Sequence, residues 1–296
     1  MVKIDYVFLS SNENPFYLDF WPVVSRAWRK MGITPVLIKI TNKDTLPYKD
    51  ANGIIKEVKR SNKTPQGLQA QLARYYFTKL FPNNFCLISD IDMLPLKKDY
   101  FFNRNIKQTA NSFIVFNSDF YPQNYQRYLT CYLLAKGKIY SEILNRGLSF
   151  ENFCKEVYSK DKTFFADEKY LYQAVKSWKG RKILIEGKQY LSSNSLGRNN
   201  WKYDPAQIVK GKYHEAHLIR PYKSYKSQID YLASLVENSM AKRTTLKDYY
   251  QQSCRFIYRI WNPEKADRLK GKSGLLLKRI FPKFYHILRK KYLQRQ

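Results

Sequence analysis

The chain has 296 residues, of which 44% are hydrophobic and 16% aromatic, so it has enough apolar material for a sizeable core and is not a disordered chain. Its formal net charge of +29 favours contact with polyanions such as nucleic acid, anionic membranes or phosphorylated substrates. The four cysteines form no CxxC pair, which argues against a disulfide framework or a zinc site. The N-terminal apolar run is too short for a signal peptide, and no stretch approaches the ~20 apolar residues of a membrane span. We therefore predict a cytoplasmic protein that is soluble or peripheral to a membrane.

The first hundred residues alternate between strand-like and helix-like segments. Strands are predicted at residues 3–10, 35–40, 53–58 and 85–88, with helices at 15–31 and 66–80. This order predicts an α/β fold whose mostly parallel sheet is covered by helices on both faces. Ligands of such sheets bind beyond the carboxyl ends of the strands, where residues 10–12 and 90–92 lie. These two segments could therefore share one crevice.

The helix boundaries follow from local signals. Gly32 is expected to end the first helix at its C′ position, and Thr64 is expected to cap the second, with Pro65 at its first position. The second helix should turn Leu72 inward and carry Gln69 and Arg74 on its other face.

The later part of the chain is predicted to contain fewer strands. We expect a strand at 112–116, a helical stretch over about 124–146, a turn and then a helix capped by Asp167 over 163–176, and strands at 182–185 and 189–191. From about residue 229 onward the sequence indicates basic helices without further strands. This divides the chain into a domain over 1–228 and a basic, mainly helical extension over 229–296.

Two carboxylates, Asp90 and Asp92, directly follow the apolar strand at 85–88. In an extended chain they would point to opposite faces, but a turn would let both reach one cation. A hard divalent ion such as Mn²⁺ or Mg²⁺ takes carboxylate and phosphate oxygens and would neutralise a diphosphate leaving group. A D-x-D pair alone also fits a solvated turn after a strand, so its context carries the interpretation.

That context resembles a known family. The run QAQLARYYFTKLFPNNFCLISDIDMLPL, over 69–96, resembles the nucleotide-sugar-binding half of GT-A fold glycosyltransferases. The opening VFLSSN and the segment FWPVVSRAWRKMG are similar to the first β/α unit of that family. The resemblance covers about residues 3–225. It implies a GT-A, Rossmann-like fold over 1–228 and transfer of a sugar from a nucleotide-diphosphate donor, such as a UDP- or GDP-linked sugar.

The resemblance also implies roles for individual residues. Asp92 would contact the metal directly, with Asp90 nearer the ribose or also bound to the metal through water. Ser10 and Asn12 would lie by the nucleotide, and Gln69 or Arg74 would approach the base or the phosphates. Arg74 also fits a surface ion pair on the helix.

Two histidines follow about 125 residues after the D-x-D pair, as His214-x-x-His217. Imidazole is a common ligand of divalent ions, and many GT-A enzymes supply a late histidine to the same metal. We therefore predict a metal site of Asp90, Asp92 and His217, while an ordinary exposed or satisfied histidine is the alternative. Arg220 and the neighbouring lysines could bind the diphosphate.

Asp167 and Glu168 open the helix predicted within 163–176. The plain interpretation is an N-cap aspartate followed by an acidic residue in the first turn. The functional one is a general base that deprotonates the acceptor hydroxyl, as inverting GT-A enzymes carry. The two interpretations are compatible, and a retaining enzyme would need no dedicated base.

The basic tail over 265–296 carries 11 Lys or Arg and one acidic residue, interleaved with apolar groups. This pattern suits an amphipathic segment on an anionic membrane at the inner face, and thus a lipid-linked acceptor besides other glycans. A helix packed on the catalytic domain is the alternative, and nucleic-acid binding fits less well because no recognisable module is present.

Two other functions compete with the transferase. A phosphohydrolase of the haloacid dehalogenase type also places D-x-D after an apolar strand and uses the first aspartate as a nucleophile, but Met93 and the long preceding β/α region argue against it. The second alternative is a non-catalytic basic adaptor for membrane or nucleic acid, which would assign no role to Asp90 or Asp92.

Overall fold

The computed structural model describes residues 4–43, 46, 48–101, 111–187, 194–199 and 201–237. The chain divides into two units, residues 1–239 and 240–296, and every described residue belongs to the first. A helical stretch at 226–237 buries Ile229 and Leu232, so the first unit continues past the boundary predicted at 228. The basic tail at 265–296, Cys254 and the strand predicted at 189–191 lie outside the described residues. None of the described helices is long and apolar enough to span a bilayer.

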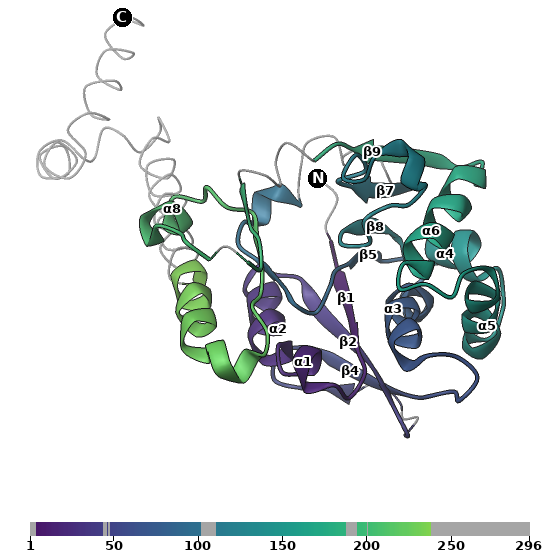
Figure 1. Cartoon of the computed structure of the whole chain (residues 1–296), viewed down its shortest axis with the longest axis horizontal. Coiled ribbons are helices and arrows are strands. Elements are labelled where there is room, and N and C mark those ends of the chain that lie inside the picture. The colour runs from purple at the N-terminus through teal and green to yellow at the C-terminus, as the bar shows by residue number, and fades with distance from the viewer. Residues whose placement is uncertain are drawn as a thin grey trace, which may run out of the picture. The chain divides into compact units, whose positions relative to one another are not determined.

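Within the described residues, the main sheet has eight strands in the order β3-β4-β2-β1-β5-β8-β7-β9 (Figure 1). They are β1 (Tyr6–Ser11), β2 (Thr34–Thr41), β3 (Tyr48–Lys49), β4 (Ile54–Lys59), β5 (Phe85–Ile88), β7 (Ser112–Phe116), β8 (Leu133–Lys136) and β9 (Arg181–Ile185). Strands β4, β2, β1 and β5 run parallel, and β9 is parallel to β7. Strand β8 is antiparallel to both of its neighbours, β5 and β7. The predicted mostly parallel sheet is confirmed.

Helices cover both faces of this sheet, as predicted. Helices α2 (Trp21–Lys30) and α3 (Gln66–Tyr76) contact its strands, and α5 (Phe150–Lys160) and α6 (Ala166–Ser177) pack on α3 and on each other. Figure 1 shows α2 on one side of the sheet and α3, α5 and α6 on the other. Alternate residues of β1 serve the two sides, because Phe8 packs in the core cluster with Leu72 of α3 while the fully buried Val7 and Leu9 point to the opposite face.

The helix boundaries differ in detail from the sequence-based ones. The first predicted helix is split into α1 (Pro15–Leu18) and α2, and it ends at Met31 with Gly32 at φ +78°, as expected. The second begins after Pro65 without a side-chain cap, so the prediction that Thr64 caps it is wrong. It continues beyond Tyr76 as a 3₁₀ turn, Phe77–Leu80.

The helix predicted over 124–146 is wrong in its central part. Residues Leu133–Lys136 form β8, which lies inside the main sheet between β5 and β7. Helical structure follows only at α4 (Gly137–Tyr140) and a π turn at Ser141–Asn145. A strand buried on both faces appears in sequence as a plain apolar run, which periodicity cannot distinguish from a buried helix.

A small second sheet lies beside the carboxyl end of β5. Its described strands follow the order β10 (Ser195–Leu196), β11 (Glu215–His217) and β6 (Met93–Pro95). Strand β6 begins immediately after Asp92, and its antiparallel pairing sets Met93 opposite His217. This pairing joins the end of β5 to a segment more than a hundred residues later in the chain.

The interior position of β8 can be tested by truncating its side chains. We expect Leu133→Ala to lower the free energy of unfolding by about 2–5 kcal/mol, because Leu133 is fully buried and its loss leaves a cavity. Leu184→Ala on β9 is the matched control; Leu184 is 50% exposed, and the change should cost about 0.5 kcal/mol. Urea unfolding followed by circular dichroism measures both. Equal losses for the two variants would contradict an interior β8.

Candidate functional site

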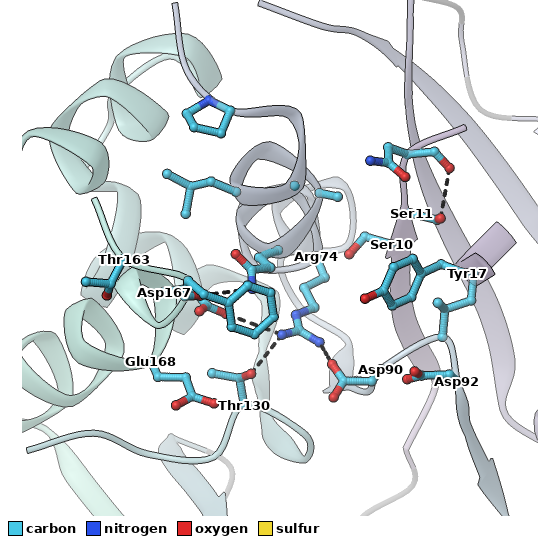
Figure 2. A pocket seen from close by; sticks show the side chains of 18 of the residues that line it. Ser10, Ser11, Tyr17, Arg74, Asp90, Asp92, Thr130, Thr163, Asp167 and Glu168 are labelled. Carbon is cyan, nitrogen blue, oxygen red and sulfur yellow. Dashed lines mark hydrogen bonds and ion pairs between the residues drawn. The ribbon is translucent and has the colours of Figure 1, made fainter. Parts of the chain in front are cut away.

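A cavity of about 550 Å³ lies at the carboxyl ends of β1 and β5 (Figure 2). Ser10 and Asn12 line it from the end of β1, and Asp90 and Asp92 line it from the end of β5. The shared crevice inferred from the strand order is therefore confirmed. The lining from the rest of the chain combines apolar residues such as Leu68, Ala70 and Ile91 with polar and charged ones, which include Tyr17, Arg74, Thr130, Lys162, Thr163, Asp167, Glu168, Arg198, His217 and Arg220.

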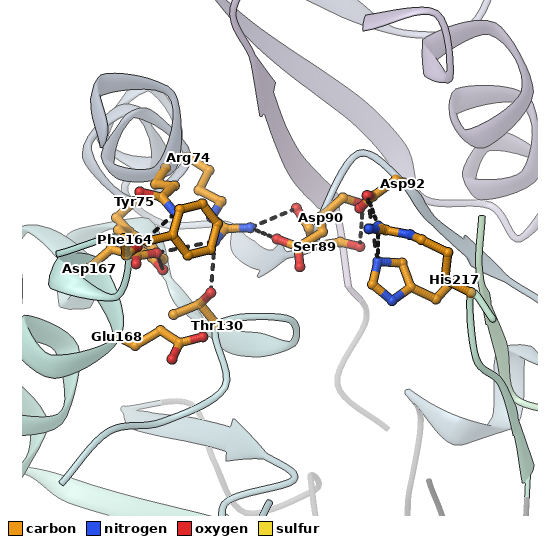
Figure 3. A network of polar contacts seen from close by, with 12 residues as sticks. Arg74, Tyr75, Ser89, Asp90, Asp92, Thr130, Phe164, Asp167, Glu168 and His217 are labelled. Carbon is orange, nitrogen blue, oxygen red and sulfur yellow. Dashed lines mark hydrogen bonds and ion pairs between the residues drawn. The ribbon is translucent and has the colours of Figure 1, made fainter. Parts of the chain in front are cut away.

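Arg74 connects the two walls of this cavity (Figures 2 and 3). Its guanidinium pairs with Asp90 on one side, and on the other it donates to the Thr130 hydroxyl at 2.8 Å and lies 3.4 Å from the Asp167 carboxylate. The Arg74 side chain is only 6% exposed. It is therefore neither a surface residue nor a member of a surface ion pair. It is a buried cation that neutralises carboxylates from β5 and α6.

Asp167 and Glu168 have different surroundings although they are adjacent. Asp167 is buried and accepts hydrogen bonds from Arg74 and from the Tyr75 hydroxyl, at 3.4 and 3.3 Å. Burial raises the pKa of Asp167, and the charge of Arg74 opposes this rise. The prediction that Asp167 caps helix α6 is wrong, because the helix begins after Phe165 without a side-chain cap.

Glu168 contacts a separate group of residues. Its carboxylate accepts a hydrogen bond from the Tyr121 hydroxyl at 3.1 Å and lies 3.7 Å from the Arg127 guanidinium. Burial and the charge of Asp167 raise the pKa of Glu168 to about 7, while Tyr121 and Arg127 act in the opposite direction. Glu168 therefore changes its protonation state near neutral pH.

Asp92 is buried at the other end of the site and is surrounded by cationic and imidazole groups (Figure 3). Its Oδ2 atom lies 2.5 Å from Nη2 of Arg198, 3.2 Å from Nη2 of Arg220 and 3.5 Å from Nε2 of His217. The pairing of β6 with β11 brings His217 close to Asp92. Beside this pairing, the Leu218 amide donates a hydrogen bond to the Asp92 backbone carbonyl at 2.8 Å.

The donor atoms around Asp92 fit a divalent cation in part. A carboxylate oxygen and an imidazole nitrogen 3.5 Å apart can bind one ion with bonds of about 2.1 Å. Among the described residues no three His, Cys, Asp or Glu side chains converge on one point, because Asp90 is directed to Arg74. A divalent cation would therefore have two protein ligands, Asp92 and His217, and phosphate or water would complete its coordination. Asp90 faces Arg74, whereas the predicted site has it as a third ligand.

The remaining predicted residues divide into those that line the cavity and those that do not. Arg220 lines it and packs its guanidinium on the Tyr17 ring, at 4.4 Å from the ring centroid. Gln69 does not line it, since its buried amide bonds to backbone atoms of Ser61 and Thr64. This placement gives Gln69 a structural role outside the cavity lining, and its contact with the nucleotide stays a prediction. His214 also lies away from the cavity lining, stacked on the Tyr100 ring.

Two residues of the site were not predicted as such. Thr130 carries no sequence signal of its own and is recognisable only through its contact with Arg74. The sequence does not indicate that Arg198 is a partner of Asp92, because 106 residues separate the two. In both cases the role of the residue can be recognised only from its contact with a distant segment of the chain.

Comparison with known proteins gives structural similarity only. No protein-family model matches the chain, and no curated protein is detectably similar in sequence. The chain is similar to the galactosyltransferase LgtC in complex with donor and acceptor sugar analogues, with 12% identity and a TM-score of 0.45 over 77% of this chain and 95% of that one. It is also similar to a glycosyltransferase involved in the glycosylation of the major capsid of PBCV-1, with 12% identity and a TM-score of 0.42 over 77% and 98%.

A third similar structure is the glycosyltransferase GlyE of Streptococcus pneumoniae TIGR4, with 11% identity and a TM-score of 0.43 over 82% of this chain and 64% of that one. At these identities and TM-scores the likeness does not assign an activity to this chain.

The role of Arg74 leads to a stability test. We expect Arg74→Met to lower the free energy of unfolding by about 3–5 kcal/mol, because the change leaves Asp167 buried without its cation. The double variant Arg74→Met, Asp167→Leu should recover much of this loss, since no uncompensated charge remains. Urea unfolding at pH 7 measures both. Arg29→Met, on the exposed side of α2, is the control, and a loss for Arg74→Met no larger than for this control would contradict the network.

Proposed function

We propose that the chain is a glycosyltransferase that moves a sugar from a nucleotide-diphosphate donor to a hydroxyl group of a glycan or lipid-linked acceptor. The observation that carries the proposal is the cavity at the ends of β1 and β5, where Asp92, His217 and two arginines face the same space. This combination suits a diphosphate together with a divalent cation, Mn²⁺ or Mg²⁺. The resemblance of residues 69–96 to GT-A glycosyltransferases supports the same conclusion.

The positive groups of the cavity support an anionic ligand. The Arg220 guanidinium is fixed by the Tyr17 ring, and its buried Nε–H has no hydrogen-bond acceptor among the described residues. A buried donor without an acceptor is costly, and a phosphate oxygen would satisfy it. Arg198 offers a second guanidinium at the same position. Ser10 and Asn12 at the end of β1 would then lie beside the nucleoside.

Asp92 and His217 are the residues that would hold the cation. When bound, a divalent cation would neutralise the charge that develops on the departing diphosphate. Asp92 is fixed for this task by its backbone bond to Leu218 and by the pairing of β6 with β11. Asp90 is fixed by Arg74 instead, so it would contribute to donor binding from the cavity wall.

Glu168 is the better of the two carboxylates to accept the proton of the acceptor hydroxyl. Asp167 is engaged by Arg74 and Tyr75, whereas the pKa of Glu168, raised by burial to about 7, is suited to proton transfer near neutral pH. Glu168 lines the same cavity as Asp92. Phe164, which is 72% exposed, lies at the rim of that cavity.

The competing phosphohydrolase would require the first aspartate of the pair as a nucleophile. Asp90 instead has a carboxylate oxygen paired with the buried guanidinium of Arg74, which reduces its nucleophilicity. This contact favours the transferase. Membrane contact through 265–296 and a location at the inner face of a membrane remain predictions from the sequence.

Metal-dependent binding of a nucleoside diphosphate tests the proposal directly. We expect isothermal titration calorimetry to detect UDP or GDP binding in the presence of Mn²⁺, and the binding to disappear on addition of a chelator. Asp92→Asn should abolish this binding while leaving the melting temperature nearly unchanged. Asp99→Asn, an exposed aspartate outside the cavity, is the control. Absence of binding for every nucleoside diphosphate tested, with and without the metal, would refute the proposal.

The role of Glu168 predicts a pH profile. Because a base must be deprotonated, kcat/KM should rise with pH and level off above about pH 7, the pKa of Glu168. Tyr121→Phe and Arg127→Gln each remove a group that lowers this pKa, so the profile should shift to higher pH. Glu168→Gln should reduce kcat by about 10²–10⁴-fold.

Glu151→Gln, on the exposed surface of α5, serves as the control for Glu168. Its profile should match that of the unaltered enzyme. A profile for Tyr121→Phe or Arg127→Gln that moves to lower pH, or full activity in Glu168→Gln, would rule out this role.

A further inference from the structure

The guanidinium of Arg198 occupies the position between Asp92 and His217. Its Nη2 atom contacts both Oδ2 of Asp92, at 2.5 Å, and Nε2 of His217. Its Nε–H donates to the backbone carbonyl of Leu218 at 3.1 Å. Arg198 thus uses the same two side-chain atoms that would hold the cation in the proposed function.

The backbone places Arg198 at this position. Leu196 of β10 lies opposite Ala216 of β11, and β11 in turn pairs with β6, which follows Asp92. Arg198 lies in a turn two residues after Leu196, so the strand pairing brings its backbone close to Asp92 and His217.

The contact also places His217. Its Nε2 atom faces both the guanidinium of Arg198 and, at 3.5 Å, Oδ2 of Asp92. Arg198 consequently holds Asp92 and His217 together, while its own Nη2 atom occupies the position beside both of them.

A divalent cation and Arg198 cannot use these atoms at the same time. Both need Oδ2 of Asp92 and Nε2 of His217, and two positive groups at one position repel each other. Arg220 differs, because it contacts Asp92 and the Tyr17 ring, and no contact of its side chain with His217 is present among the described residues. Arg220 thus competes with the cation at Oδ2 of Asp92 alone, whereas Arg198 competes at both atoms.

We propose that Arg198 is a displaceable substitute for the divalent cation: it holds Asp92 and His217 in the metal-free protein and leaves them when the cation and the donor diphosphate bind together. The diphosphate then supplies the anionic partner that Arg198 has lost. This inference rests on the proposed function, because it assumes that Asp92 and His217 are the cation ligands. It makes cation binding weak without diphosphate and couples the binding of the two ligands.

Binding of Mn²⁺ alone, without any turnover, tests the first part. Free Mn²⁺ is measured by electron paramagnetic resonance during titration of the full chain and of Arg198→Gln. We expect the variant to bind Mn²⁺ at least about fivefold more tightly, because the competitor has been removed. Arg198→Lys, measured in parallel, keeps the charge but loses the fork that reaches both atoms, and should also bind more tightly than the unaltered chain. Arg181→Gln, on exposed β9, should leave the affinity unchanged.

Repeating the titrations with saturating UDP or GDP tests the coupling. The diphosphate should increase the Mn²⁺ affinity of the unaltered chain by a larger factor than the Mn²⁺ affinity of Arg198→Gln. The reason is that the variant has no guanidinium that could move from Asp92 and His217 to the diphosphate. Equal or weaker Mn²⁺ binding by Arg198→Gln and Arg198→Lys, with metal-dependent diphosphate binding intact, would overturn the role of Arg198 and leave the proposed function in place. No Mn²⁺ binding by any of the proteins with diphosphate present would overturn both.

Discussion

The site depends on the neutralisation of carboxylates that are buried after strand β5 and at the start of helix α6. Asp92 and Asp167 are almost completely enclosed, and an isolated ionised carboxylate in such a place is strongly destabilising. Arginines from distant parts of the chain provide the opposite charge: Arg74 for Asp90 and Asp167, and Arg198 and Arg220 for Asp92. These ion pairs define where a phosphate or a cation can bind without leaving a buried charge unpaired.

The same pairs divide the site into two halves with separate structural origins. Arg74 lies on α3 and connects the end of β5 to α6, so this half belongs to the main sheet and its helices. The half around Asp92 depends on the small sheet, because β6 and β11 align His217 with Asp92 and β10 adds Arg198. A ligand that contacts both halves would bridge the two sheets, which suits a donor with a nucleotide at one end and a sugar at the other.

Adjacent residues can have different tasks in such a network. Asp167 and Glu168 look equivalent in the sequence as two acids at a helix start, yet Asp167 is directed to Arg74 and Glu168 to Tyr121 and Arg127. Their helical spacing turns them about 100° apart, so each meets different neighbours. The raised pKa of Glu168, about 7, follows from its burial and from the charge of Asp167 beside it.

Local sequence patterns determined the alternation of strands and helices, the mostly parallel sheet and the crevice at residues 10–12 and 90–92, because periodicity and strand ends are properties of neighbouring residues. Only the tertiary structure decided which side chains meet across long separations. In the tertiary structure, Leu133–Lys136 lies inside the sheet and Arg74 points inward. The Gln69 amide hydrogen-bonds to the backbone of 61–64, and Arg198 contacts Asp92. Each of these depends on burial and pairing between segments far apart in the chain, which no local pattern encodes.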